Sequence, residues 1–150
     1  MKRQTGFTLV ELLVVLAILG ILAASAVPLY RTIQQRTYGR EAVLMVKRLL
    51  DAQILYFLEN DKYYPQDDHP IDILQSSSPT SPFVVEVENN LNLTIPVGHF
   101  LDYALQASNV QGAELFSVTI SANFPLFRNG AKLLVGSVDK DGTITYIIPD

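Results

Sequence analysis

The stretch GFTLVELLVVLAILGILAASAVPLY, residues 6–30, decides how the rest of the chain is organised. Residues 12–30 carry no charge, and a helix of nineteen residues at ~1.5 Å each would span ~28 Å, close to the hydrocarbon thickness of a bilayer. Glu11 stands immediately before this run. Because a carboxylate in hydrocarbon costs on the order of 3 kcal/mol, Glu11 needs a partner that offsets this cost.

Two simpler interpretations of the apolar run compete. A secretory signal peptide would use Lys2 and Arg3 as its basic region, but the run is longer than a signal-peptide core and Glu11 would interrupt it. A plain signal anchor is the other alternative. Charge does not fix the orientation, because five further bases follow the run. These bases are Arg31, Arg36, Arg40, Lys47 and Arg48.

Composition narrows the class of protein. The chain has 150 residues, so about 120 remain after the apolar run, enough for one small domain. It has no cysteine, which excludes disulfides, and only two histidines, His69 and His99. Residues 51–150 contain thirteen acids against four bases, a net charge of −9. Because of this negative charge, we expect that nucleic acid is not the main partner. The sequence shows no recognisable catalytic constellation, so we also expect no cofactor and no enzymatic activity.

The helical pattern continues beyond the apolar run. Apolar residues recur at spacings of three and four, which predicts a helix face that packs on a domain. The residues of this face are Ala42, Val46, Leu49, Ala52 and Tyr56. The helix should end near residues 59–61, before the Tyr64-Pro65 pair, because a residue that precedes proline disfavours helical geometry.

The C-terminal part reads as a sheet. Residues 66–99 are rich in turn formers, with candidate short strands at 83–87 and 91–95. Apolar and polar residues then alternate in four predicted strands, which indicates an antiparallel sheet with one face against the helix. These strands are residues 100–107, 115–122, 133–138 and 143–148. The predicted fold class is α+β, a long N-terminal helix packed on a C-terminal antiparallel sheet of about four strands.

Three local features could carry chemistry or modification. Asp139 and Asp141 are weak calcium candidates, because calcium needs six or more oxygen ligands and an ordinary hairpin turn explains the stretch. Residues 76–81 could carry glycans, although a solvated loop is the favoured interpretation. Asn92-Leu93-Thr94 fits a glycosylation sequon of low specificity.

The order of residues at the N-terminus resembles the type IV prepilin signal, which type IV pilins share with the pseudopilins of type II secretion. A basic leader, MKRQTG, precedes an aromatic residue, and an acid stands at the fifth place after the leader. The resemblance implies cleavage between Gly6 and Phe7 by a prepilin peptidase and N-methylation of Phe7. It also implies a cytoplasmic leader and an acidic domain on the outer side of the membrane.

The same resemblance assigns roles within the helix. It implies that Glu11 pairs with the terminal amine of an adjacent subunit and acts as a register device during assembly. Gly20 and Pro28 match family positions between which the helix is thought to lose order in filaments. The segment AQILYFLENDKYYP, residues 52–65, also resembles the family, with aromatic residues that close the helix onto the domain.

The family pattern divides the chain into a prepilin leader at 1–6, a transmembrane and filament-core half-helix at 7–30, an amphipathic half-helix at 31–61, an αβ-loop at 62–99 and an antiparallel sheet at 100–150. The resemblance then implies a structural subunit of a type IV filament that serves adhesion, motility or DNA uptake. The alternative is a pseudopilin of a type II secretion system, and a remote alternative is a signal-anchored periplasmic enzyme or binding module. The chain lacks the tryptophans usual in major pseudopilins and the disulfide loop of many pilins.

The implied partners are the chain itself, other pilin subunits, the prepilin peptidase and an inner-membrane assembly platform. The implied location is the bacterial inner membrane, as a single-pass protein with a cytoplasmic N-terminus. After assembly it would be a pilus at the cell surface or a periplasmic pseudopilus.

Overall fold

The computed structural model of the chain describes residues 7–66, 69–110 and 113–148. The chain forms two compact units, the first ending at Gln34 and the second beginning at Gln35. Helix α1, Leu9–Asn60, contributes to both of them. Its 52 residues confirm the predicted long N-terminal helix, which ends within the predicted range.

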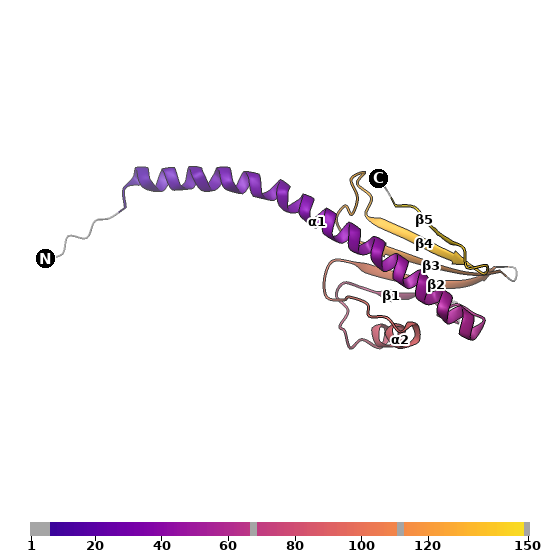
Figure 1. The fold of residues 1–150 in the computed structure, drawn as a ribbon. Coiled ribbons are helices and arrows are strands. Elements are labelled where there is room, and N and C mark those ends of the chain that lie inside the picture. Colours follow the sequence, from indigo (N-terminus) through magenta and orange to yellow (C-terminus); the bar gives the residue numbers. More distant parts are fainter. Residues whose placement is uncertain (1–6, 67–68, 111–112, 149–150) are drawn as a thin grey trace. The chain divides into compact units, whose positions relative to one another are not determined.

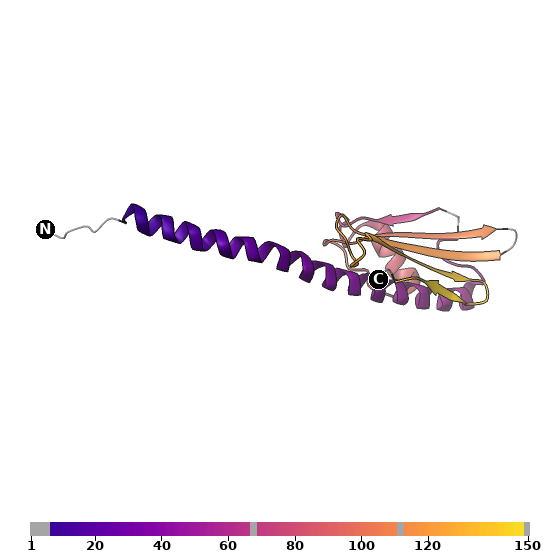
Figure 2. The same cartoon turned by 90° about the horizontal axis from the view of Figure 1, so that it is seen from above.

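In the second unit, α1 runs along one face of a sheet (Figures 1 and 2). Ala42, Val46 and Leu49 have no exposed surface, and Ala52 and Tyr56 are half-buried. This burial confirms the predicted packing face. The bases Arg40 and Lys47 lie on the exposed side of the same helix. Spacing of three and four residues therefore separates the core from solvent, as expected of an amphipathic helix.

The sheet is an antiparallel meander of five strands in chain order. Its strands are β1 (Ile71–Ile73), β2 (Asp102–Val110), β3 (Ala113–Ser121), β4 (Leu133–Asp139) and β5 (Ile144–Tyr146). Phe116, Val118 and Ile120 on β3 are fully buried, whereas Ser117 and Thr119 between them are half-buried. Period-two alternation therefore identifies the strand and also its covered face.

The prediction of about four strands missed β1. Its three residues lie within the stretch that the turn formers predict to be loop. Ile71 pairs with Leu105 and Ile73 with Tyr103, so β1 is held by β2 at the edge of the sheet. Three residues give too short a pattern to identify a strand, and the pairing partner is some thirty residues away.

The candidate strands at 83–87 and 91–95 were wrong. Residues 82–91 form helix α2 (Pro82–Leu91), and residues 92–95 contain no strand. The valine-rich run reads as a strand locally, but Val84, Val87 and Leu91 bury one helical face at a spacing of three and four residues. Burial of this face outweighs the weak strand preference of valine.

Aromatic residues after α1 fasten the helix end to the sheet, as the sequence predicts. Tyr63 stacks on Phe57 with ring centroids 4.7 Å apart, and its hydroxyl donates to the carbonyl of Asp139 at 2.6 Å. The fully buried Gln53 amide donates to the carbonyl of Tyr64 at 2.6 Å and accepts from its N–H at 3.0 Å. The chain reversal after α1 is therefore fixed by buried hydrogen bonds.

Two glycines let α1 lie close to its neighbours. A Cβ on Gly136 of β4 would stand 2.5 Å from Cγ1 of Val46 and 3.0 Å from Cδ1 of Leu50. A Cβ on Gly39 would meet the backbone carbonyl oxygen of Leu126. Since backbone atoms cannot rotate away as a side chain can, the position of Gly39 is the stricter of the two.

Gly39→Ala should destabilise the second unit by about 1–3 kcal/mol, because the new methyl group clashes with a backbone oxygen. Alanine is a better helix former than glycine by about 1 kcal/mol, so propensity alone predicts the opposite sign. Denaturant unfolding of the full chain in detergent, followed by tyrosine fluorescence, measures the change. Thr37→Ala is the matched control on an exposed position of the same turn, and equal midpoints for both variants would contradict the packing argument.

Candidate assembly segment

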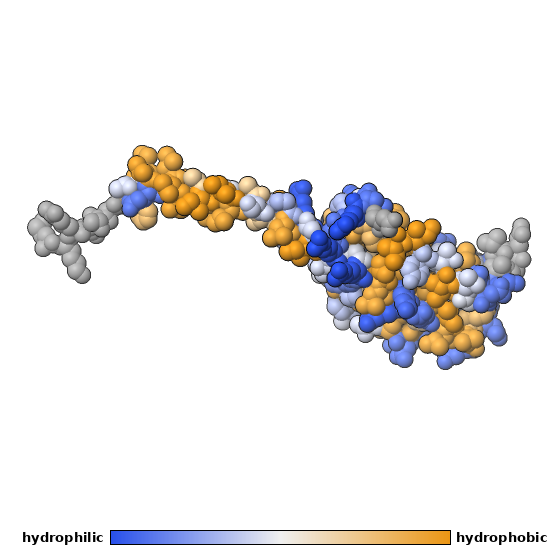
Figure 3. Space-filling view, turned by 45° about the horizontal axis from the view of Figure 1, so that its top comes forward, coloured by the Kyte–Doolittle hydropathy of each residue, from blue (hydrophilic) through white to orange (hydrophobic). Residues whose placement is uncertain are grey.

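The first unit presents an apolar surface along α1. Every described residue from Phe7 to Ile33 is exposed, and hydrophobic residues cover this part of the helix (Figure 3). By length and composition, α1 contains one segment able to cross a membrane, with none of that segment buried. An apolar surface of this size is stable only in lipid or against other protein chains.

The start of α1 is a capping box built by Thr8 and Glu11. The Thr8 N–H and hydroxyl donate to one carboxylate oxygen, Oε2 of Glu11, at 2.9 and 2.8 Å. The Glu11 N–H in turn donates to Oγ1 of Thr8 at 3.2 Å. This reciprocal pattern satisfies free N–H groups of the first turn. The role of Thr8 was not predicted from the sequence, although the Thr-x-x-Glu spacing is its recognised signature.

The predicted cleavage site is only partly visible. Gly6 lies outside the described residues, and Phe7 precedes the first helical residue with 82% of its surface exposed. The predicted cut therefore leaves one residue, Phe7, before the capping box of Thr8 and Glu11. Glu11 lies in the first turn of the helix, where the unpaired N–H groups and the helix dipole favour a carboxylate.

Gly20 and Pro28 both lie inside α1, which is helical at both positions. Pro28 has no N–H to donate along the helix, and a Cβ on Gly20 would meet no neighbouring atom within 4 Å. The hydroxyl of Thr32 donates to the carbonyl of Pro28 at 3.0 Å. Loss of helical order between Gly20 and Pro28 in a filament stays a prediction.

The calcium candidates form a turn. Oδ1 of Asp139 accepts the N–H groups of Asp141 at 3.0 Å and Thr143 at 2.9 Å, and the Gly142 N–H donates to the Asp139 carbonyl at 2.9 Å. The Asp139 carboxylate therefore shapes the link between β4 and β5. Among the described residues, no group of three histidine, aspartate or glutamate side chains could hold a metal ion.

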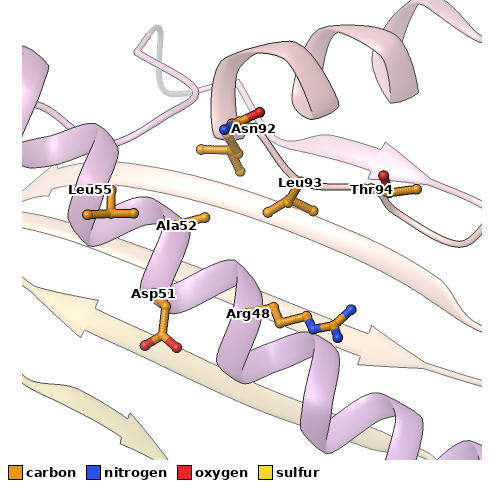
Figure 4. Close-up of a pocket in the computed structure, with 8 residues that line it drawn as sticks. Arg48, Asp51, Ala52, Leu55, Asn92, Leu93 and Thr94 are labelled. Atoms are coloured by element: carbon orange, nitrogen blue, oxygen red, sulfur yellow. The ribbon is translucent and has the colours of Figure 1, made fainter.

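A pocket of about 470 Å³ lies between α1 and the segment that follows α2. Figure 4 shows Asn92, Leu93 and Thr94 on one side and the side chains of α1 on the other. Arg48 and Asp51 supply the charges of its lining, and the remainder is largely apolar. This lining contains no histidine or cysteine, so it offers no familiar nucleophile–base pair.

The described fold is an α+β unit whose long helix lies across one face of a meander sheet, and this helix includes a segment long and apolar enough to cross a membrane. Residues 1–27 match the family model described as the prokaryotic N-terminal methylation motif. Over part of its length the chain is similar to type IV major pilins and to a type II secretion core protein.

Three relatives illustrate the similarity. The type IV major pilin protein PilE of Neisseria gonorrhoeae is 40% identical over 85 residues, 57% of this chain and 50% of its own length. The type IV major pilin protein PilA of Myxococcus xanthus is 48% identical over 61 residues, 41% of this chain and 28% of its own. The type II secretion system core protein G of Vibrio cholerae is 39% identical over 82 residues, 55% of each chain. No solved structure matches the chain. The chain spans about half or less of the length of these relatives.

Thr8→Val should loosen the first turn of α1, because it removes the hydroxyl that accepts the Glu11 N–H. We expect about fivefold faster hydrogen exchange at the Glu11 amide in detergent micelles, equivalent to a cap of about 1 kcal/mol. Thr8→Ser keeps the hydroxyl and should exchange at the native rate. Equal exchange in the valine and serine variants would contradict the capping box.

Proposed function

We propose that the chain is a structural subunit of a type IV filament that polymerises through the N-terminal half of α1. The observation that carries this proposal is the methylation motif at residues 1–27, which from Leu9 onward lies in a helix whose apolar side chains are left exposed by the rest of the described chain. In a filament, the same half-helices of other copies would supply that cover. Each fully buried Leu, Ile, Val or Phe would then contribute about 1.5–3 kcal/mol.

The proposed maturation takes place at the membrane. A prepilin peptidase cuts between Gly6 and Phe7 on the cytoplasmic side, and the new terminus is N-methylated. The subunit is stored in the inner membrane as a single-pass protein, with its acidic unit on the outer side. An inner-membrane assembly platform then transfers it into the filament. The type IV pilins and protein G among the relatives support this route.

Glu11 would fix the height at which a subunit docks. Cleavage leaves a positive amine on Phe7, and a neighbouring Glu11 carboxylate can pair with it in the apolar filament core. A buried ion pair adds little net stability, but removal of one partner costs about 3–5 kcal/mol, because the other charge is left alone. A subunit at the wrong height leaves both charges unpaired. The capping box holds the same carboxylate until that pair forms.

Within the family, we favour a pilin of a type IV pilus over a pseudopilin. Both kinds of relative match over similar lengths, but the chain has no tryptophan, which major pseudopilins usually contain. The pilin would serve adhesion, motility or DNA uptake. We expect no catalytic activity, and the apolar pocket beside α1 does not favour one.

The proposal predicts where the chain is found and how it begins. Filaments sheared from the native cells should contain it, with methylated Phe7 as its first residue by mass spectrometry. The membrane fraction of the same cells is the control for unassembled chain. Processed chain that is confined to the membrane would instead favour a pseudopilin, and a chain that still begins at Met1 would refute the maturation.

Glu11→Ala should leave cleavage intact but lower the yield of sheared filaments at least about tenfold, because the Phe7 amine loses its partner. Asp51→Ala is the matched control, since it removes an exposed acid from the same helix. Gel mobility reports the cut and quantitative immunoblots report the yield. Native filament yield from the Glu11 variant would overturn the register argument.

A further inference from the structure

One end of the second unit carries exposed bases. The Gln35 side chain donates to the carbonyl of Phe127, and Gly39 lies against the carbonyl of Leu126, so α1 meets the loop before β4 at this end. Four exposed basic residues come from these two segments. The basic end is defined as Arg36, Arg40, Arg128 and Lys132.

The opposite end carries acids. Tyr63 donates to the Asp139 carbonyl there, and its pKa is raised by burial first and then by the carboxylates of Asp139, Glu114 and Asp141. Three carboxylates therefore gather around one phenol. Two more acids lie at and just beyond the C-terminus of α1, and both are exposed. The acidic end is defined as Glu59, Asp61, Glu114, Asp139 and Asp141.

The two ends keep opposite signs when the neighbouring charges of the described residues are counted. Lys62 and Lys140 bring the acidic end to −3. Glu41 and Asp102 bring the basic end to +2, and both have partners, His99 at 3.3 Å and the Gln75 N–H at 2.6 Å. The His99–Glu41 contact is an ion pair only when His99 is protonated, and the count of +2 takes His99 as neutral. Within residues 7–66, 69–110 and 113–148, neither end is therefore neutralised by neighbouring charges.

The ends are too far apart to neutralise each other. β3 has nine residues and runs from the acidic end to the basic end, which at ~3.3 Å per residue separates them by roughly 30 Å. Charges in water are screened over about 8 Å at physiological ionic strength. When two different, complementary surfaces of one unit meet on neighbouring copies, the contact is head-to-tail, and such contacts build rings if the rotation between copies closes and open helical filaments if it does not.

We propose that the acidic end of one copy docks on the basic end of the next copy along the filament. This inference rests on the proposed function and adds a second contact to the apolar helix core. Anionic lipid headgroups could also occupy the basic end, but they would leave the acidic end without a partner. A second copy of the chain satisfies both ends at once, and opposite charges also guide the approach of two copies.

Charge reversal tests the contact in the full chain. Arg128→Glu with Lys132→Glu changes the basic end to −2, which then faces −3. Glu59→Lys with Asp141→Lys changes the acidic end to +1, which then faces +2. Each pair should lower the yield of sheared filaments about tenfold, because like charges meet. All four changes together place −2 opposite +1 and should restore the yield to within about twofold of the native chain.

Matched controls change the same charge away from both ends. Lys47→Glu with Arg48→Glu, and Asp72→Lys with Glu86→Lys, alter exposed positions outside the two ends and should assemble normally. Circular dichroism in detergent and the amount of processed chain in membranes check that each variant folds and matures.

Failure of the fourfold variant to recover would overturn the proposal. The proposal would also be overturned if only the variant with Arg128→Glu and Lys132→Glu lost filament yield. That result would indicate that the basic end binds lipid. Reversals that all assemble normally would refute the contact and leave the proposed function intact. A native chain that is absent from sheared filaments would instead refute the proposed function.

Discussion

The apolar surface of residues 7–33 is the constraint on which the rest of the molecule depends. Its leucines, valines and isoleucines are exposed in the chain by itself, so they require lipid or other copies. A helix that moves from one apolar environment to another loses little hydrophobic stabilisation on the way. Glu11 is the single acid in this surface, and in the chain by itself its carboxylate is held by the N–H and hydroxyl of Thr8.

In the second unit, the C-terminal half of the long helix α1 is held against a small sheet. Close approach is possible because Gly39 and Gly136 have no side chain at the contact. The helix end is then fixed by Gln53, whose buried amide forms two hydrogen bonds with the backbone of Tyr64. Aromatic packing around Tyr63 joins the same segment to the end of β4. Tight packing and satisfied polar groups together make this part of α1 a fixed element of the unit.

The charged side chains distinguish one end of the second unit from the other. The formal net charge of −4 conceals a basic segment in α1 and an acidic remainder of the chain. The fold places Arg128 and Lys132 beside the basic part of α1, and it gathers Glu114, Asp139 and Asp141 around Tyr63. Charges that are scattered along the sequence thus become two ends of opposite sign, which gives the unit a polarity that an apolar helix core alone does not supply.

The sequence by itself determined the features that depend on local order. The length of α1, its packing face, the alternation in β3 and the prepilin motif with Glu11 all follow from spacing and residue type, which act over a few neighbouring positions. The capping role of Thr8 was equally local and could have been found. Only the tertiary structure decided that β1 pairs with β2, that residues 82–91 form a helix and that distant charges share an end. Each of these depends on contacts between segments far apart in the chain, whose burial outweighs weak local preferences.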